Sequence, residues 1–117
     1  MSLPELKVAV SNSGAITIVA VEGHLNTLTV GILETKLDAV LATDTRRIVV
    51  DCADLCFISS AGLRVFLSSV KRMKSRGGSC AFATLAPAVR EIFEMAGFLE
   101  TMEVHTSLAL ALASENP

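Results

Sequence analysis

The chain has 117 residues, of which 51% are hydrophobic, and its mean hydropathy is +0.57. This length suffices for one domain core and is too short for two, and no apolar run reaches the roughly 20 residues that a membrane span needs. Ten basic and twelve acidic residues give a net charge of -2, and the basic residues form no stripe interleaved with aromatic side chains, so we expect no nucleic-acid partner.

Cysteine usage and the N-terminus indicate the compartment. Cys52, Cys56 and Cys80 are an odd number in apolar surroundings, which favours structural thiols in a reducing environment. No basic segment followed by an apolar one begins the chain, so no secretory signal is visible and we expect a cytoplasmic location. Residues 1–3 are interpreted as a cloning remnant, and residues 114–117 are expected to fray.

The first third of the chain predicts a hairpin followed by a helix. Residues 6–11 alternate apolar and polar side chains, and residues 15–21 form a nearly continuous apolar or β-branched run that Gly23 closes. Asn12 to Gly14 supply turn chemistry between these two strands. Residues 27–41 change to helical spacing, with an apolar stripe of Val30, Leu33, Leu37 and Leu41.

The rest of the chain alternates strands with helices. The apolar run 48–50 predicts a central buried strand, and a second amphipathic helix follows an irregular segment and ends at Gly77 and Gly78. A strand is predicted at 80–83, a third helix from Pro87 to Gly97, an edge strand at 102–104 and a last helix capped by Thr106. The order predicts one α/β domain over residues 1–117, with a mixed, mostly parallel sheet of about five strands and about four helices.

The segment 51–67, DCADLCFISSAGLRVFL, is the most informative part of the sequence. A buried strand leaves through a polar loop into a helix that begins at Ser59 and Ser60, at the kind of strand end where α/β sheets bind ligands. In one interpretation the serines only cap the helix, with Gly62 allowing close packing. In the other, a kinase reaches an exposed hydroxyl and adds about -1.5 to -2 charges to a docking surface.

The run VVDCADLCFISSAGLRVFL resembles the signature of STAS domains, the bacterial anti-sigma factor antagonist family, and VEGHLNTLTV resembles the family's second strand and following loop. The strand and helix order from Leu6 to Leu112 is similar to the whole fold. The resemblance implies a protein without catalytic activity that binds an anti-sigma factor with serine kinase activity. Binding to the anti-sigma factor would release a sigma factor. Phosphorylation of this chain would weaken that binding, and a phosphatase would restore it.

Residue by residue, the resemblance puts Ser59 where many members carry aspartate, and Ser60 at the first serine of the motif. Ala61 occupies the place where the regulatory serine often lies, and Asn26 a place that is commonly aspartate. We therefore expect Ser60 as the first and Ser59 as the second phosphoacceptor candidate. The partner-binding residues implied are Asn26, Ser59, Ser60, Ala61, Gly62 and Arg64.

Ala61 keeps a second function open, because alanine has no hydroxyl to phosphorylate. The chain would then be a constitutive STAS-type assembly or transporter-accessory subunit that phosphorylation does not regulate. Pairing of the chain with itself also stays open. The basic residues along and beyond the second helix are interpreted as a solvated face, with steering of an acidic partner as the alternative; they are Arg64, Lys71, Arg72, Lys74 and Arg76.

The sequence predicts no catalytic site, metal site or cofactor. The serine run lacks the G-x-S-x-G pattern of a hydrolase elbow, and His24 and His105 are the only imidazoles. The cysteines lack zinc-ligand spacing, and there is no phosphate-binding glycine motif. Phe57 and Ile58 are predicted to point inward and fix the serine loop, so that truncating Phe57 would cost about 3–5 kcal/mol if it is buried.

Overall fold

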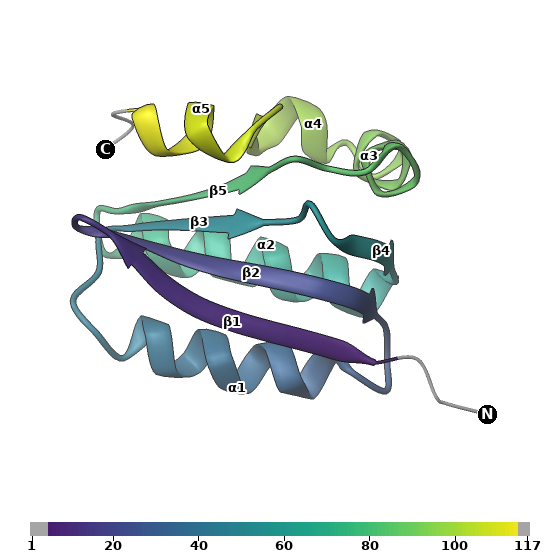
Figure 1. Cartoon of the computed structure of the whole chain (residues 1–117), viewed down its shortest axis with the longest axis horizontal. Helices are drawn as coiled ribbons and strands as arrows, with labels where there is room; N and C mark the ends of the chain where they lie inside the picture. The colour runs from purple at the N-terminus through teal and green to yellow at the C-terminus, as the bar shows by residue number, and fades with distance from the viewer. Residues whose placement is uncertain (1–4, 115–117) are drawn as a thin grey trace.

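A mixed six-stranded sheet with helices on both faces organises the chain in a computed structural model, which describes residues 5–114 (Figure 1). The elements in chain order are β1 (Leu6–Ser13), β2 (Ile16–Leu25), α1 (Val30–Leu41), β3 (Arg47–Asp51), β4 (Leu55–Ile58), α2 (Ser60–Ser75), β5 (Ser79–Ala83), α3 (Pro87–Met95), α4 (Phe98–Thr101), β6 (Glu103–His105) and α5 (Leu108–Ala113).

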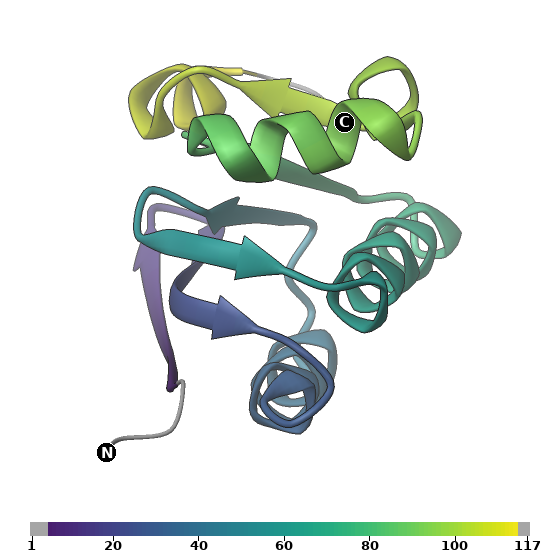
Figure 2. The ribbon, with the colours of Figure 1, turned by 90° about the vertical axis from the view of Figure 1, so that its right-hand side faces the viewer.

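The strand order is β1-β2-β3-β5-β6, and β4 pairs with the far end of β2. Only the β1–β2 hairpin is antiparallel; β3, β4, β5 and β6 join by parallel pairing. Helices α1 and α2 lie together on one face of the sheet (Figure 2), where they enclose the main core. This core contains the packed rings of Phe66, Phe82 and Phe93, with centroids of the first two 4.8 Å apart.

The opposite face of the sheet is covered by α5, and one buried arginine holds it there. Arg47 on β3 is 7% exposed, and its guanidinium donates to the Ser79 hydroxyl at 2.8 Å and to the Glu103 carboxylate at 2.6 Å. The same group donates to the backbone carbonyl of Ala111 at 2.8 Å. A single side chain therefore joins β3 to β5, β6 and α5.

The predicted order of strands and helices is confirmed, with two short elements added: β4 and α4. The second strand also runs past Gly23 to Leu25, because Gly23 takes a φ of +108° at the point where the pairing of β2 shifts to β4. The last helix is capped by Ser107, whose hydroxyl accepts from the Leu110 N–H at 3.1 Å, and the expectation that Thr106 caps it is wrong.

The prediction that Phe57 points inward is wrong, while Ile58 does point inward. In the parallel pairing of β2 with β4, Ile58 lies beside Leu25 and Phe57 beside His24. Leu25 and Ile58 are buried in the core, whereas Phe57 and the exposed His24 beside it lie outside the core, and Phe57 is 43% exposed. Cys56 is exposed as well, which corrects its assignment to apolar surroundings.

Several expectations concern the ends of the chain and the membrane. The interpretation of residues 1–3 and the fraying of residues 115–117 lie outside the described residues. Ser114 is described, and its N–H still bonds to the Leu110 carbonyl at 3.2 Å. Within residues 5–114, no helix has the length and apolar character that crossing a membrane requires.

Candidate functional site

The first turn of α2 lies directly on the ends of β2 and β4. The Ser59 N–H donates to the Leu25 carbonyl at 2.9 Å, which ties the start of the helix to the last residue of β2. A Cβ placed on Gly62 would lie 2.7 Å from Leu25 Cγ and 2.9 Å from Ile58 Cγ1. Only glycine permits this approach, so Gly62 sets the position of the two serines that precede it.

The two adjacent serines have different roles in the helix start. Ser59 is the N-cap: its hydroxyl accepts from the Gly62 N–H at 3.4 Å, its carbonyl accepts from the Leu63 N–H at 3.0 Å, and the residue is half-buried. Ser60 is the first residue of α2 and is exposed, and no other residue between 5 and 114 hydrogen-bonds its hydroxyl. Of the two phosphoacceptor candidates, Ser60 thus presents the accessible hydroxyl.

Asn26 shapes the loop that follows β2. Its side-chain oxygen accepts from the backbone N–H groups of Leu28 at 2.9 Å and Thr29 at 3.1 Å. The buried Thr29 hydroxyl donates to the His24 carbonyl at 2.6 Å, which closes the turn. Because Asn26 follows Leu25, whose carbonyl holds Ser59, the loop and the start of α2 lie side by side.

The remaining members of the predicted partner-binding set lie on the first turns of α2. Ala61 is half-buried and Arg64 is exposed. Arg64 follows Ser60 by four residues, so both project from the same face of the helix. The structure thus brings Asn26, Ser59, Ser60, Ala61, Gly62 and Arg64 together at one end of the sheet.

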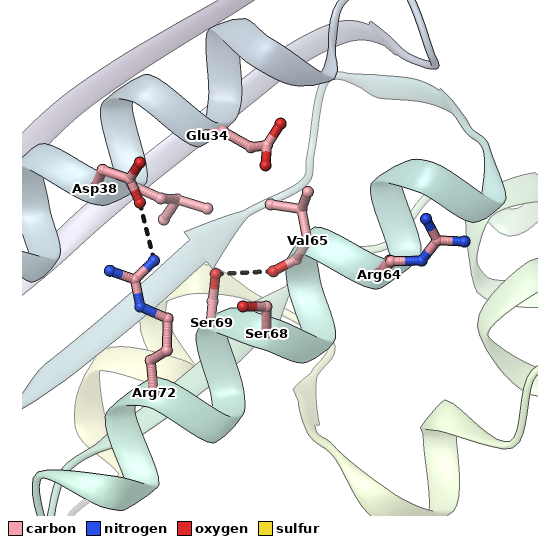
Figure 3. Close-up of a pocket in the computed structure, with 8 residues that line it drawn as sticks. Glu34, Asp38, Arg64, Val65, Ser68, Ser69 and Arg72 are labelled. Atoms are coloured by element: carbon pink, nitrogen blue, oxygen red, sulfur yellow. Dashed lines mark hydrogen bonds and ion pairs between the residues drawn. The ribbon is translucent and has the colours of Figure 1, made fainter.

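A shallow pocket of about 210 Å³ continues from this end along the groove between α1 and α2 (Figure 3). Arg72 and Asp38 form an ion pair across it at 2.9 Å, and both side chains are at least half exposed. Arg64 points away from this pair in Figure 3. The pocket is therefore a solvated groove whose charges largely face water.

Three large apolar side chains near the strand ends are exposed, and the sequence reasoning missed them. Leu28 is 82% exposed and Ile32 46% exposed, in the loop after Asn26 and the first turn of α1. Phe57, at 43%, precedes the N-cap serine by two residues. The signal for Leu28 was in the sequence, since it falls outside the apolar stripe of the helix that follows.

The cysteines divide into two buried thiols and one exposed thiol. Burial raises the pKa of Cys80 to about 12, and burial with the nearby Asp51 carboxylate raises the pKa of Cys52 still further. Both are therefore protonated and unreactive near neutral pH. Cys56 lies on β4 in contact with solvent, and no group of three potential metal ligands exists among the described residues.

Among the described residues, neither histidine ring is hydrogen-bonded to Ser59 or Ser60. The His24 ring lies against Phe57, with centroids 6.4 Å apart. His105 Nε2 lies 2.6 Å from the Glu103 carboxylate on β6. His24 thus packs on an aromatic ring and His105 is hydrogen-bonded to a carboxylate, so neither forms a serine–base pair.

Comparison with known proteins gives one consistent result. The family model described as the STAS domain matches residues 7–111. A Bordetella bronchiseptica protein named as an anti-sigma factor antagonist, BtrV, is 35% identical over 109 residues, covering 93% of this chain and 94% of that protein.

Solved structures show the same fold. An anti-sigma factor antagonist from Mycobacterium paratuberculosis superposes with a TM-score of 0.86 at 23% identity, over 92% of each chain. The anti-sigma factor antagonist SpoIIAA of Bacillus, in its unphosphorylated form, has a TM-score of 0.76 at 16% identity, over 92% of this chain and 93% of that chain.

Proposed function

Because the chain belongs to the STAS domain family, we propose that it is an anti-sigma factor antagonist whose docking surface is switched by phosphorylation of Ser60. Its partner is an anti-sigma factor with serine kinase activity, and a phosphatase restores the unmodified form. The protein itself performs no chemistry. Three free cysteines, two of them buried, support a reducing, cytoplasmic setting.

The observation that carries the proposal is the exposed Ser60 hydroxyl at the start of α2. The neighbouring hydroxyl of Ser59 is engaged in capping the helix, whereas that of Ser60 is not. The family's regulatory serine often lies one residue later, at the position of Ala61. Ser60 thereby offers a modifying enzyme a hydroxyl immediately before that position. The relative SpoIIAA, of the same fold, is known in unphosphorylated and phosphorylated forms, which supports such a switch on this architecture.

Electrostatics explains why a phosphate would alter docking and leave the fold intact. A phosphate on Ser60 adds about -1.5 to -2 charges at the N-terminus of a helix, where the helix dipole favours negative charge. No acidic residue lies in the first turn of α2 to oppose it, and Arg64 follows one turn later. The new charge therefore acts mainly on the partner that faces it.

Phosphate mapping tests the proposal directly. The purified chain is incubated with ATP and an anti-sigma factor kinase encoded beside its own gene, and the modified residue is identified by mass spectrometry. We expect phosphate on Ser60 in the wild type and in the matched Ser59→Ala variant, and none in Ser60→Ala. Phosphate found only at other residues would refute regulation through Ser60.

Ala61 favours a second candidate, a constitutive assembly or transporter-accessory role. A pull-down with the same anti-sigma factor compares the wild type, Ser60→Ala and Ser60→Asp. The switch predicts a loss of affinity on the order of tenfold or more for Ser60→Asp, equivalent to about 1.4 kcal/mol. Equal recovery by all three proteins would instead support the fixed role.

A further inference from the structure

Within residues 5–114, no strand pairs with the outer edge of β1. β1 is the terminal strand of the sheet and pairs only with β2 among the described elements (Figure 2). The His24 N–H donates to the Glu5 carbonyl at 3.0 Å, which fixes which residues of the ladder are hydrogen-bonded to β2. From Glu5 on, the backbone N–H and C=O groups of every second residue point toward β2. The backbone groups that point outward therefore belong to Leu6, Val8, Val10 and Asn12.

This edge lacks the features by which proteins usually protect a terminal strand. β1 has eight residues with an unbroken register against β2, contains no proline and carries one charged side chain, Lys7. The opposite edge, β6, is only three residues long and contains the polar residues Glu103 and His105, with His105 Nε2 2.6 Å from the Glu103 carboxylate. A long, regular and weakly charged edge is a template for another strand.

We propose that the strand which pairs with β1 is β1 of a second copy of this chain, in an antiparallel arrangement about a two-fold axis. The axis passes between the two Ala9 residues. Val8 then lies opposite Val10 of the second copy, and Leu6 opposite Asn12 of the second copy. All four outward residues of each strand are paired, giving roughly eight interstrand hydrogen bonds.

Charge and polarity select this register over its neighbours. It places Lys7 opposite Ser11 of the second copy, whereas a shift that centres the axis on Lys7 would bring the two ammonium groups together and halve the number of backbone bonds. It also covers Val10, which is 43% exposed in the single chain. The strand is thus complementary to itself, which favours a second copy over an unrelated strand.

The dimer is independent of the proposed switch, since it uses the edge of the sheet and not the start of α2. Sedimentation velocity over a range of concentrations tests it with Val10→Pro. Proline removes an N–H that points away from β2, so the hairpin ladder of the single chain is kept. We expect a concentration-dependent dimer for the wild type and the Val10→Thr control, and a monomer for Val10→Pro. At concentrations where the wild type is itself monomeric, the two should unfold at nearly the same temperature.

Cysteine cross-linking tests the register without relying on proline. In a Cys56→Ser background, Ala9→Cys places two thiols at a non-hydrogen-bonded pair about 4.5 Å apart between Cα atoms, within the range of a disulfide. The matched Lys7→Cys variant faces Ser11 of the second copy and has no thiol partner. We expect oxidation to bridge the first variant and to leave the second largely unbridged.

Three results would overturn the inference. The first is a wild-type chain that stays monomeric at every concentration. The second is a dimer that both Val10→Pro and a Val10→Lys variant leave intact. The third is equal bridging of the Ala9→Cys and Lys7→Cys variants, which would indicate random collision.

Discussion

Replacing Gly62 by alanine should destabilise the protein, although alanine normally favours a helix. The added Cβ would lie 2.7 Å from Leu25 Cγ, 2.8 Å from Leu25 Cδ2 and 2.9 Å from Ile58 Cγ1. Carbon atoms in contact normally lie about 3.5–4.0 Å apart, so each distance is short by roughly 1 Å. Leu25 is 0% and Ile58 2% exposed, so neither can move into solvent.

The size of the effect follows from two opposed terms. Overpacking a buried site costs about 1–3 kcal/mol, and the gain in helix propensity offsets at most about 1 kcal/mol. We expect a net loss of about 1–2 kcal/mol in the free energy of unfolding for Gly62→Ala, measured by urea denaturation followed by circular dichroism. Gly31→Ala on α1 is the matched control, because no atom beyond its chain neighbours and its own helix backbone lies within 4 Å of the added Cβ. If the two variants were equally stable, the close approach of α2 to the strand ends would not be what requires glycine.

Three further predictions concern burial, capping and ionisation. Phe57→Ala should lower the free energy of unfolding by about 1 kcal/mol, against about 3–5 kcal/mol for the fully buried Phe66→Ala, and comparable losses would contradict the outward placement of Phe57. Ser59→Ala should cost about 0.5–1 kcal/mol in urea denaturation, the low end for an N-cap, because its bond to the helix is long at 3.4 Å. Burial raises the thiol pKa values of Cys52 and Cys80 above the ordinary 9.0, so the folded state holds these protons more tightly than the unfolded state. The resulting contribution to the free energy of unfolding is complete below about pH 9 and is lost as the pH rises toward 12. Urea midpoints measured against pH should show this decline in the wild type and a weaker one when both thiols are replaced by alanine; the same decline in both proteins would refute it.

Long elements with a clear pattern could be predicted from the sequence. The second strand of the hairpin, the amphipathic helix α1 and the buried strand β3 each have an apolar pattern that burial explains directly. The position of Ser59 and Ser60 at a helix start also followed from local chemistry, since serine caps a helix and a buried strand precedes it.

The parts that could not be predicted depend on tertiary pairing. β4 has four residues in which Leu55 and Ile58 are buried while the two between them are exposed, so it shows no strand alternation. β4 forms because β2 continues past Gly23 and its last residues pair with β4. The same pairing decides that Phe57 faces outward, which no local pattern could indicate. α4 is a single turn set by Gly97 at a φ of +77°, and it is too short for helical periodicity.

The buried guanidinium of Arg47 implies an order of assembly. Its partners on β5, β6 and α5 are 32, 56 and 64 residues further along the chain. During synthesis, the Arg47 guanidinium has no carboxylate partner until Glu103 has been added to the chain. A shorter nascent chain would have to bury an uncompensated charge or leave β3 exposed to water. A chain that ends before β6 and α5 therefore lacks the groups that neutralise and hydrogen-bond this buried cation in the complete fold.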